Sequence, residues 1–260
     1  MIRSTLLFVF FIAAASASPA LASSALFGFN ITTQSLVRID PTTGAATNYG
    51  PSGTLFNSDL TYDPVGERLI GYGRLARPVE YNLFTGISTF VSGFGAGSIN
   101  ALEYVPDSDT YYVVQPALQS LGTLDFGSGF SVVAPIGREN LVRFAYDTLA
   151  DTMYSYDVIL DELVTVDLNS GAVQTIGATG LQIIGLAYEP ESDQLFGIDV
   201  FNDVLVTLDR QTGAATVIGG QNLNGVTSIA FVPAELVPEP AALGSVLLAV
   251  TCLGISARRV

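Results

Sequence analysis

The sequence predicts an all-β fold, a five-bladed β-propeller of four-stranded repeats about 42 residues long. The first observation is a set of turn glycines at intervals of 42, 43, 42 and 42 residues, namely Gly44, Gly86, Gly129, Gly171 and Gly213. The second is an aromatic residue two positions before a proline or threonine, which keeps the same period at Tyr62, Tyr104, Tyr146, Tyr188 and Phe231. Two independent anchors in register indicate one repeated structural unit.

The third observation is that each repeat contains four short runs of alternating or β-branched residues, separated by Gly, Asp, Asn and Pro turns. The fourth repeat shows them best, at residues 184–188, 195–199, 204–208 and 215–218. These runs are too short and too often interrupted by glycine for helices. Four strands per repeat is the size of a propeller blade, whereas a β-solenoid, the competing architecture, usually has shorter and more uniform turns.

The phase of the repeat predicts how the ring closes. The chain opens at what should be a second strand, residues 26–29, and its last run, residues 226–232, is an inner strand without a blade of its own. Pairing of these two segments would complete a fifth blade and remove exposed sheet edges. We therefore expect one propeller domain over residues 25–234, with its two ends close together.

The composition supports a stable core and excludes much catalytic chemistry. Of the 260 residues, 49% are hydrophobic and 13% are charged, which is ample for a core. The chain has no His and no Lys, and its one cysteine, Cys252, lies in the C-terminal apolar run. Catalytic triads, His/Cys zinc sites and Schiff-base lysines are thereby disfavoured, and no cofactor is expected. The formal net charge of −14 disfavours nucleic-acid partners.

The N-terminus has the features of a secretion signal. Arg3 precedes an apolar run over residues 6–15, and residues 20–22 read Ala-Leu-Ala. A positive start, an apolar core that is short for a membrane span and a small-residue cleavage site predict a signal peptide over residues 1–22.

The C-terminal segment, residues 235–260, differs from the repeats. It contains a Val-Pro-Glu-Pro motif at residues 237–240, then the uncharged apolar run 241–257, then a terminal arginine pair. A run of 17 residues is at the lower edge of what spans a bilayer, and the arginines agree with the positive-inside tendency. By itself this segment predicts a marginal transmembrane helix.

This combination resembles the PEP-CTERM sorting signal of exopolysaccharide-producing Gram-negative bacteria. The resemblance covers residues 237–260 and implies removal of the tail by an exosortase-type membrane protease, after transient insertion of residues 241–257 into the inner membrane. The resemblance implies that the protease recognises Pro238, Glu239 and Pro240. It implies that Arg258 and Arg259 are the cytoplasmic stop. The implied location is the cell envelope, the cell surface or the extracellular matrix, and permanent anchoring stays open.

Three charged residues fall at ring positions expected to face the central channel. Alignment on the proline anchor places Asp59 and Arg143 at one position and Glu103 two residues later, on three consecutive blades. Most other residues at these positions are small, as a crowded channel requires. One interpretation is a ligand site of the kind that five-bladed glycosidases build from carboxylates. The other, which is favoured, is a structural ion pair between Glu103 and Arg143.

Two Asp-x3-Asp pairs bracket the turn between the second and third strands of two blades, namely Asp157/Asp161 and Asp199/Asp203. Their oxygens suit a hard cation such as Ca²⁺. Aspartate is also a common turn residue, and the first repeat has Asn30 and Gln34 at the equivalent positions. A turn role is therefore expected, with no metal site. The recurring aromatic residues of the inner strands are expected to pack between blades.

These observations predict an exported, non-enzymatic structural or binding module, with extracellular polysaccharide as the partner that the tail's resemblance implies. The alternative is a carbohydrate-active enzyme, similar to a glycoside hydrolase, that uses Asp59 and Glu103. Such an enzyme should place two carboxylates about 5–10 Å apart around an open pocket.

Overall fold

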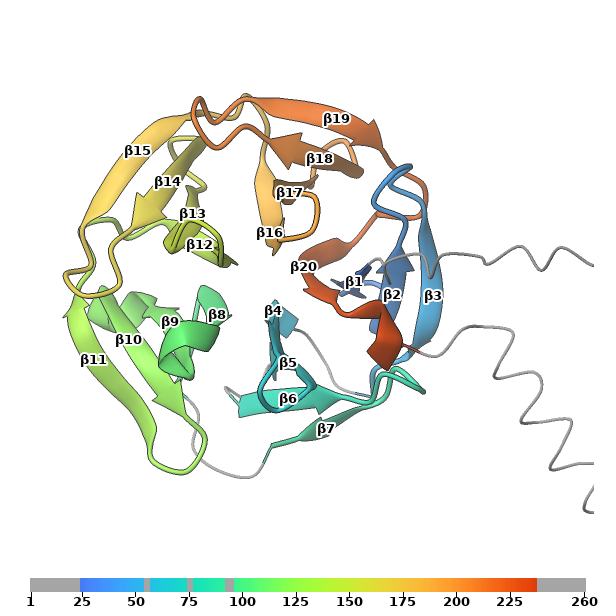
Figure 1. The fold of residues 1–260 in the computed structure, drawn as a ribbon, viewed down its shortest axis with the longest axis horizontal. Helices are drawn as coiled ribbons and strands as arrows, with labels where there is room; N and C mark the ends of the chain where they lie inside the picture. Colours follow the sequence, from blue (N-terminus) through green and yellow to red (C-terminus); the bar gives the residue numbers. More distant parts are fainter. Residues whose placement is uncertain (1–23, 54–56, 74–76, 92–95, 238–260) are drawn as a thin grey trace, which may run out of the picture.

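The computed structural model describes residues 24–53, 57–73, 77–91 and 96–237. In these residues, five antiparallel sheets of four strands each stand around a central axis (Figure 1). The predicted five-bladed β-propeller is confirmed. The predicted signal peptide lies outside the described residues, and so does the tail beyond Val237.

From the channel outwards, blade 1 consists of β20 (Val226–Val232), β1 (Ala25–Asn30), β2 (Ser35–Ile39) and β3 (Ala46–Pro51). Blade 2 consists of β4 (Asn57–Asp63), β5 (Arg68–Gly73), β6 (Arg77–Tyr81) and β7 (Ser88–Phe90). Blade 3 consists of β8 (Ala101–Val105), β9 (Thr110–Gln115), β10 (Ser120–Asp125) and β11 (Gly129–Pro135). Blade 4 consists of β12 (Leu141–Asp147), β13 (Thr152–Asp157), β14 (Glu162–Val166) and β15 (Val173–Ala178). Blade 5 consists of β16 (Ile183–Glu189), β17 (Gln194–Asp199), β18 (Val204–Leu208) and β19 (Ala215–Gly219).

Three short 3-10 helices complete the described elements, namely η1 (Pro106–Ser108), η2 (Pro116–Leu118) and η3 (Ala234–Leu236). After η3, Val237 is buried and packs into the core between blades 1 and 2. The packed chain therefore continues three residues past the domain end that the repeat predicts.

The ring closes in blade 1, where the two ends of the propeller share a sheet. The inner strand β20 pairs antiparallel with β1, from Ala25 opposite Val232 to Asn30 opposite Val226. Figure 1 shows this sheet with the last strand, in red, beside the first strands, in blue. The closure predicted from the phase of the repeat is confirmed.

The hydrophobic core lies between neighbouring blades, with one cluster of buried side chains at each of the five interfaces of the described chain. In β18, Leu205 packs toward blade 1 and the next residue, Val206, packs toward blade 4, and neither is exposed. Successive strand side chains point to opposite faces of a sheet. Because both faces of each blade are covered, the third strands contain adjacent apolar residues.

The recurring glycines end the turn between the third and fourth strands. In blade 5, Oδ1 of Asp209 accepts hydrogen bonds from the N–H groups of Gln211 and Thr212, both at 2.8 Å. Gly213 donates its own N–H to the Asp209 carbonyl at 2.8 Å, with φ of 79°. Glycine adopts this left-handed conformation without a steric penalty. The 42-residue period of the sequence is the period of this turn.

Candidate functional site: the central channel

The inner strands β4, β8, β12, β16 and β20 surround the central channel (Figure 1). Asp59, Glu103 and Arg143 lie on the first three of these strands. The structure brings the three charges together, since Arg143 lowers the pKa of Asp59 and Asp59 raises that of Glu103. Their individual contacts decide what each side chain does.

Asp59 is fully buried and bound by backbone N–H groups. Its carboxylate oxygens accept hydrogen bonds from the N–H of Leu60 at 3.1 Å and of Leu102 at 2.9 Å. Loss of solvation raises the pKa of Asp59 to about 7, although the charge of Arg143 and the backbone donors oppose this rise. Leu102 belongs to β8, so Asp59 links the inner strands of blades 2 and 3.

The guanidinium of Arg143 lies between the inner strands of three other blades. Its Nε donates to the carbonyls of Ile184 and Thr227, the latter at 3.1 Å, and Nη1 donates to the carbonyl of Asn100 at 3.3 Å. Arg143 itself has φ of 55° at a β-bulge in β12, which turns its side chain toward these carbonyls. Among the described residues no ion pair joins it to Glu103, so the favoured Glu103–Arg143 pair is not formed.

Glu103 is half-buried, and its ring position is two residues further along the inner strand than that of Asp59, closer to the end of the channel. Burial and the neighbouring Asp59 raise the pKa of Glu103 well above its usual range, against hydrogen bonds from the Thr61 hydroxyl and the Tyr146 N–H. Thr61 Oγ1 also accepts a hydrogen bond from the N–H of Tyr104 at 2.9 Å. Asp59 and Thr61 of β4 therefore both accept hydrogen bonds from backbone N–H groups of the next inner strand, β8.

A pocket of about 320 Å³ opens where the inner strands end, and we refer to it as the channel mouth. Glu103 lines it together with the apolar residues Leu186, Ala187, Ile229 and Ala230. The sequence analysis expected small residues to fit a crowded channel. At this end they leave space, because Ala187 and Ala230 stand at the ring position that Glu103 occupies in blade 3.

Acidic residues form the rim of the channel mouth, and no arginine lines it. Glu191 and Glu235 are exposed, whereas Glu189 is buried. Burial raises the pKa of Glu189, but hydrogen bonds from the Ser24 hydroxyl and from Ser192 lower it below its usual range overall. Because Ser24 and Glu235 both line the mouth, the two ends of the described chain meet at its rim, as the sequence predicts.

The recurring inner-strand tyrosines also reach the channel mouth, although their rings lie in the core. Tyr104 and Tyr146 are buried, and their hydroxyls donate to Asp109 at 2.6 Å and to Asp151 at 2.5 Å. Each acceptor is five residues after its tyrosine and has positive φ. Sequence analysis did not identify these pairs. The sequence feature that could have identified them is an aspartate five residues after the tyrosine in successive repeats.

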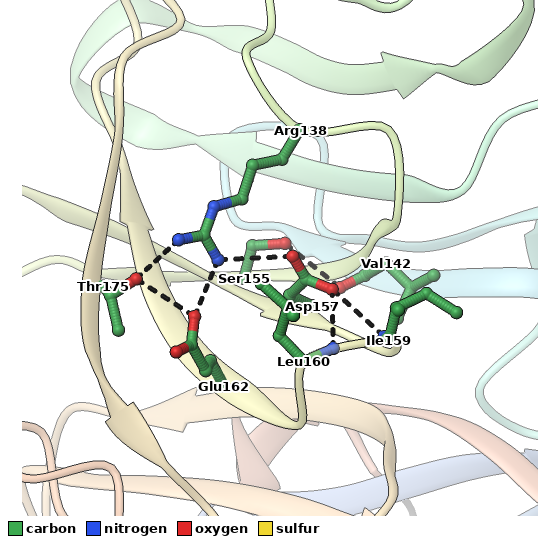
Figure 2. Close-up of polar contacts among 8 residues, drawn as sticks. All are labelled: Arg138, Val142, Ser155, Asp157, Ile159, Leu160, Glu162 and Thr175. Carbon is green, nitrogen blue, oxygen red and sulfur yellow. Dashed lines mark hydrogen bonds and ion pairs between the residues drawn. The ribbon is translucent and has the colours of Figure 1, made fainter.

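The Asp157 carboxylate stabilises a turn beside the start of β12, at the end of the blade away from the channel mouth. Figure 2 shows its polar contacts. Its Oδ1 accepts hydrogen bonds from the N–H groups of Ile159 at 3.0 Å and Leu160 at 3.1 Å. Its Oδ2 pairs with Arg138 at 3.2 Å, and Arg138 also pairs with Glu162 at 2.9 Å. Both oxygens of Asp157 are therefore occupied within the protein.

The other three aspartates of the Asp-x3-Asp pairs also accept hydrogen bonds within the protein. Asp161 accepts hydrogen bonds from the side chains of Tyr156 and Gln182, Asp199 from the N–H of Phe201 at 3.0 Å, and Asp203 from the side chain of Asn224 at 3.0 Å. Within the described ranges, no three His, Cys, Asp or Glu side chains are arranged to hold a metal ion. Asp199 therefore stabilises its turn as Asp157 does, whereas Asp161 and Asp203 accept hydrogen bonds from side chains.

The terminal residues singled out in the sequence lie beyond the described part of the chain. They are Pro238, Glu239, Pro240, Arg258 and Arg259, together with the apolar run 241–257. Within the part that is described, no helix is long and apolar enough to cross a membrane.

The chain resembles known proteins in fold alone. No family model matches it, and no curated protein matches it. One solved structure, from a nidogen/laminin complex, superposes with a TM-score of 0.56 at 10% identity, over 82% of this chain and 86% of that chain. Another, a structural genomics protein of unknown function from Bacteroides thetaiotaomicron, has a TM-score of 0.53 at 14% identity, over 81% of this chain and 60% of that chain.

Proposed function

We propose that this protein is an exported, non-enzymatic binding module that holds an extracellular polysaccharide at its channel mouth. The observation that carries the proposal is the channel mouth itself, a concave pocket of about 320 Å³ with apolar walls and a few convergent carboxyl groups. Ligand sites in proteins commonly combine a mostly apolar cavity with a few polar groups that orient the ligand.

The carboxyl groups of the channel support binding over hydrolysis. A glycoside hydrolase uses one carboxylic acid and a second carboxylate on either side of the scissile bond. Glu103 lines the mouth, but Asp59 does not, and both Asp59 oxygens accept backbone hydrogen bonds. The pair on which the enzymatic alternative depends is therefore not presented to a ligand.

The proposed location rests on the two ends of the sequence. The signal peptide over residues 1–22 and the resemblance of residues 237–260 to a PEP-CTERM tail support export to the envelope of a Gram-negative bacterium and processing by an exosortase-type protease. A biofilm matrix that contains exopolysaccharide is the setting that this route implies.

Co-sedimentation with exopolysaccharide from the producing cells tests the binding function. We expect the full-length protein to sediment with the polymer, and Ala230→Phe, which fills the mouth, to weaken binding by about tenfold or more. Ala117→Phe makes the same change at an exposed position in η2 and should bind like the wild type. Equal binding by all three proteins would place the site elsewhere, and release of reducing ends from the polymer would establish an enzyme.

Mass spectrometry of the mature C-terminus tests the sorting proposal. Protein from the native cell surface should end near Pro238-Glu239-Pro240, while a host without the protease should retain the full chain in its membrane fraction. An intact Val260 on the native surface would establish a permanent anchor.

A further inference from the structure

We propose that the channel mouth selects an ammonium group, so that its polysaccharide partner is a polymer of amino sugars with free amines. This inference rests on the function proposed above and names the chemical class of its ligand. It follows from the charge of the mouth, the position of Glu103 and the shape of the pocket.

Every acidic or basic side chain that lines the mouth is a glutamate. Four glutamates line it, namely Glu103, Glu189, Glu191 and Glu235, and neither an arginine nor a lysine does. A uronic acid or sulfated polymer would place its anions against these carboxylates, in a protein that already has a net charge of −14. Like-charge contacts of this kind suppress binding, whereas a cation is drawn toward such a site.

Glu103 is the carboxyl group that an ammonium would meet inside the mouth. Hydrogen bonds from the Thr61 hydroxyl and the Tyr146 N–H lower the pKa of Glu103, but they do not offset the effect of its burial. Its burial favours the protonated form, and no cation among the lining residues counters this. A bound ammonium would supply the missing positive charge and up to three hydrogen-bond donors. Glu103 should therefore ionise and release a proton when such a ligand binds.

The shape of the mouth suits one sugar residue with an amine better than a long apolar ligand. Its volume of about 320 Å³ is at the small end of known ligand pockets. Four of the five inner-strand rings, those of Tyr104, Tyr146, Tyr188 and Phe231, are less than one tenth exposed, and only the ring of Tyr62 is partly exposed. Ala187 and Ala230 provide the space beside Glu103, so a sugar ring there would contact small apolar groups and one carboxyl group.

Isothermal titration of the full-length protein in nonionic detergent tests the inference. The probes are glucosamine oligomers, the same oligomers fully N-acetylated, galacturonate oligomers, and a lysine-rich peptide that carries ammonium groups without sugar. We expect the free-amine oligomers to bind about tenfold or more tightly than the N-acetylated ones, and the galacturonates not to bind. Repeating the titration in buffers with different ionisation enthalpies should show proton release on binding of the amine.

Two variants connect this selectivity to the mouth. Glu103→Gln should abolish the proton release and reduce the preference for the amine, whereas Glu139→Gln, the same change at an exposed loop position, should retain both. Ala187→Leu keeps every charge and fills the pocket, so it should lose binding of the amine. It tests the pocket independently if Glu103→Gln does not fold.

The outcomes separate this inference from the proposed function. Equal binding of free-amine and N-acetylated oligomers at the mouth overturns the inference and leaves polysaccharide binding intact. Binding of a lysine-rich peptide with no oligosaccharide binding overturns the proposed polysaccharide partner. Amine binding that both Glu103→Gln and Ala187→Leu leave unchanged would reflect general attraction to an acidic protein and would overturn the inference.

Discussion

At the scale of single residues, Arg143 contacts more blades than any other side chain described above. Its guanidinium donates to carbonyls of blades 1, 3 and 5, and its charge acts on Asp59 in blade 2. A guanidinium retains its charge when buried, so it can satisfy several carbonyls where the inner strands converge. The residue that the sequence marked as a ligand candidate therefore stabilises the centre of the ring.

Arg143→Met should destabilise the protein by about 3–5 kcal/mol, because it leaves Asp59 without its counter-charge and removes the side-chain donor to the carbonyls of Ile184 and Thr227. Urea denaturation measures the effect. Arg38→Met, at a partly exposed position in β2, should change the unfolding free energy by less than about 0.5 kcal/mol. Equal stability of the two variants would contradict the role of Arg143.

Asp59 should make stability depend on pH. Its pKa is raised from 3.8 to about 7, so the folded state holds this proton more tightly than the unfolded state does. The resulting stabilisation is complete below about pH 4 and is lost as the pH rises to about 7, with a total change of up to about 4 kcal/mol.

Asp59→Asn removes this titration, so the stability of the wild type relative to the variant should fall between pH 4 and pH 7. Parallel pH profiles of the two unfolding free energies would show that Asp59 titrates normally in the folded protein.

At the scale of elements, turns of one blade pack against the outer strand of the blade before it. A Cβ atom added to Gly177 of β15 would lie only 2.1 Å from the carbonyl oxygen of Thr212, in the last turn of blade 5. Gly50 of β3 meets the carbonyl of Thr85 at the same distance. These strand glycines are required by close approach of backbone, not by their own backbone conformation.

Gly177→Ala should therefore destabilise the protein by about 1–3 kcal/mol, because blades 4 and 5 must separate to admit the methyl group. Thermal unfolding followed by circular dichroism measures this. Gly137→Ala adds the same methyl group where no atom lies within 4 Å and should have little effect. A neutral Gly177→Ala would mean that these two blades are not in tight contact.

At the scale of the whole molecule, β20 connects the end of the propeller to its beginning. A chain ending at Gly225 loses this strand, which exposes the edge of β1 and removes one wall from the cores on both sides of blade 1. We expect it to lose its cooperative thermal transition and to become sensitive to protease. A chain ending at Val237 retains the closed ring and should melt like the full-length protein. An unchanged transition in the shorter chain would contradict closure by β20.

The elements of this fold could be predicted from the sequence to a large extent. The recurring turn glycines and the alternation within strands depend on residues close in the chain. Together with the phase of the repeat, they indicated the five blades and the pairing of β20 with β1. The bulge at Arg143 was not visible, because an extra residue in one strand is defined only by the strand opposite. That bulge turns Arg143 toward backbone carbonyls of other blades, and the predicted ion pair with Glu103 does not form.

The sequence by itself determined the number of blades, their strand order and the closure of the ring, since local pattern and period specify them. Only the tertiary structure decided what the channel residues do. Asp59 and Arg143 bind backbone groups of other blades, and every residue carries such groups, so the sequence does not mark these partners. From the sequence alone, Ala187 and Ala230 are recognised only as small residues. Whether they fill a channel or leave a pocket depends on the distance between inner strands, and that distance exists only once the ring has closed.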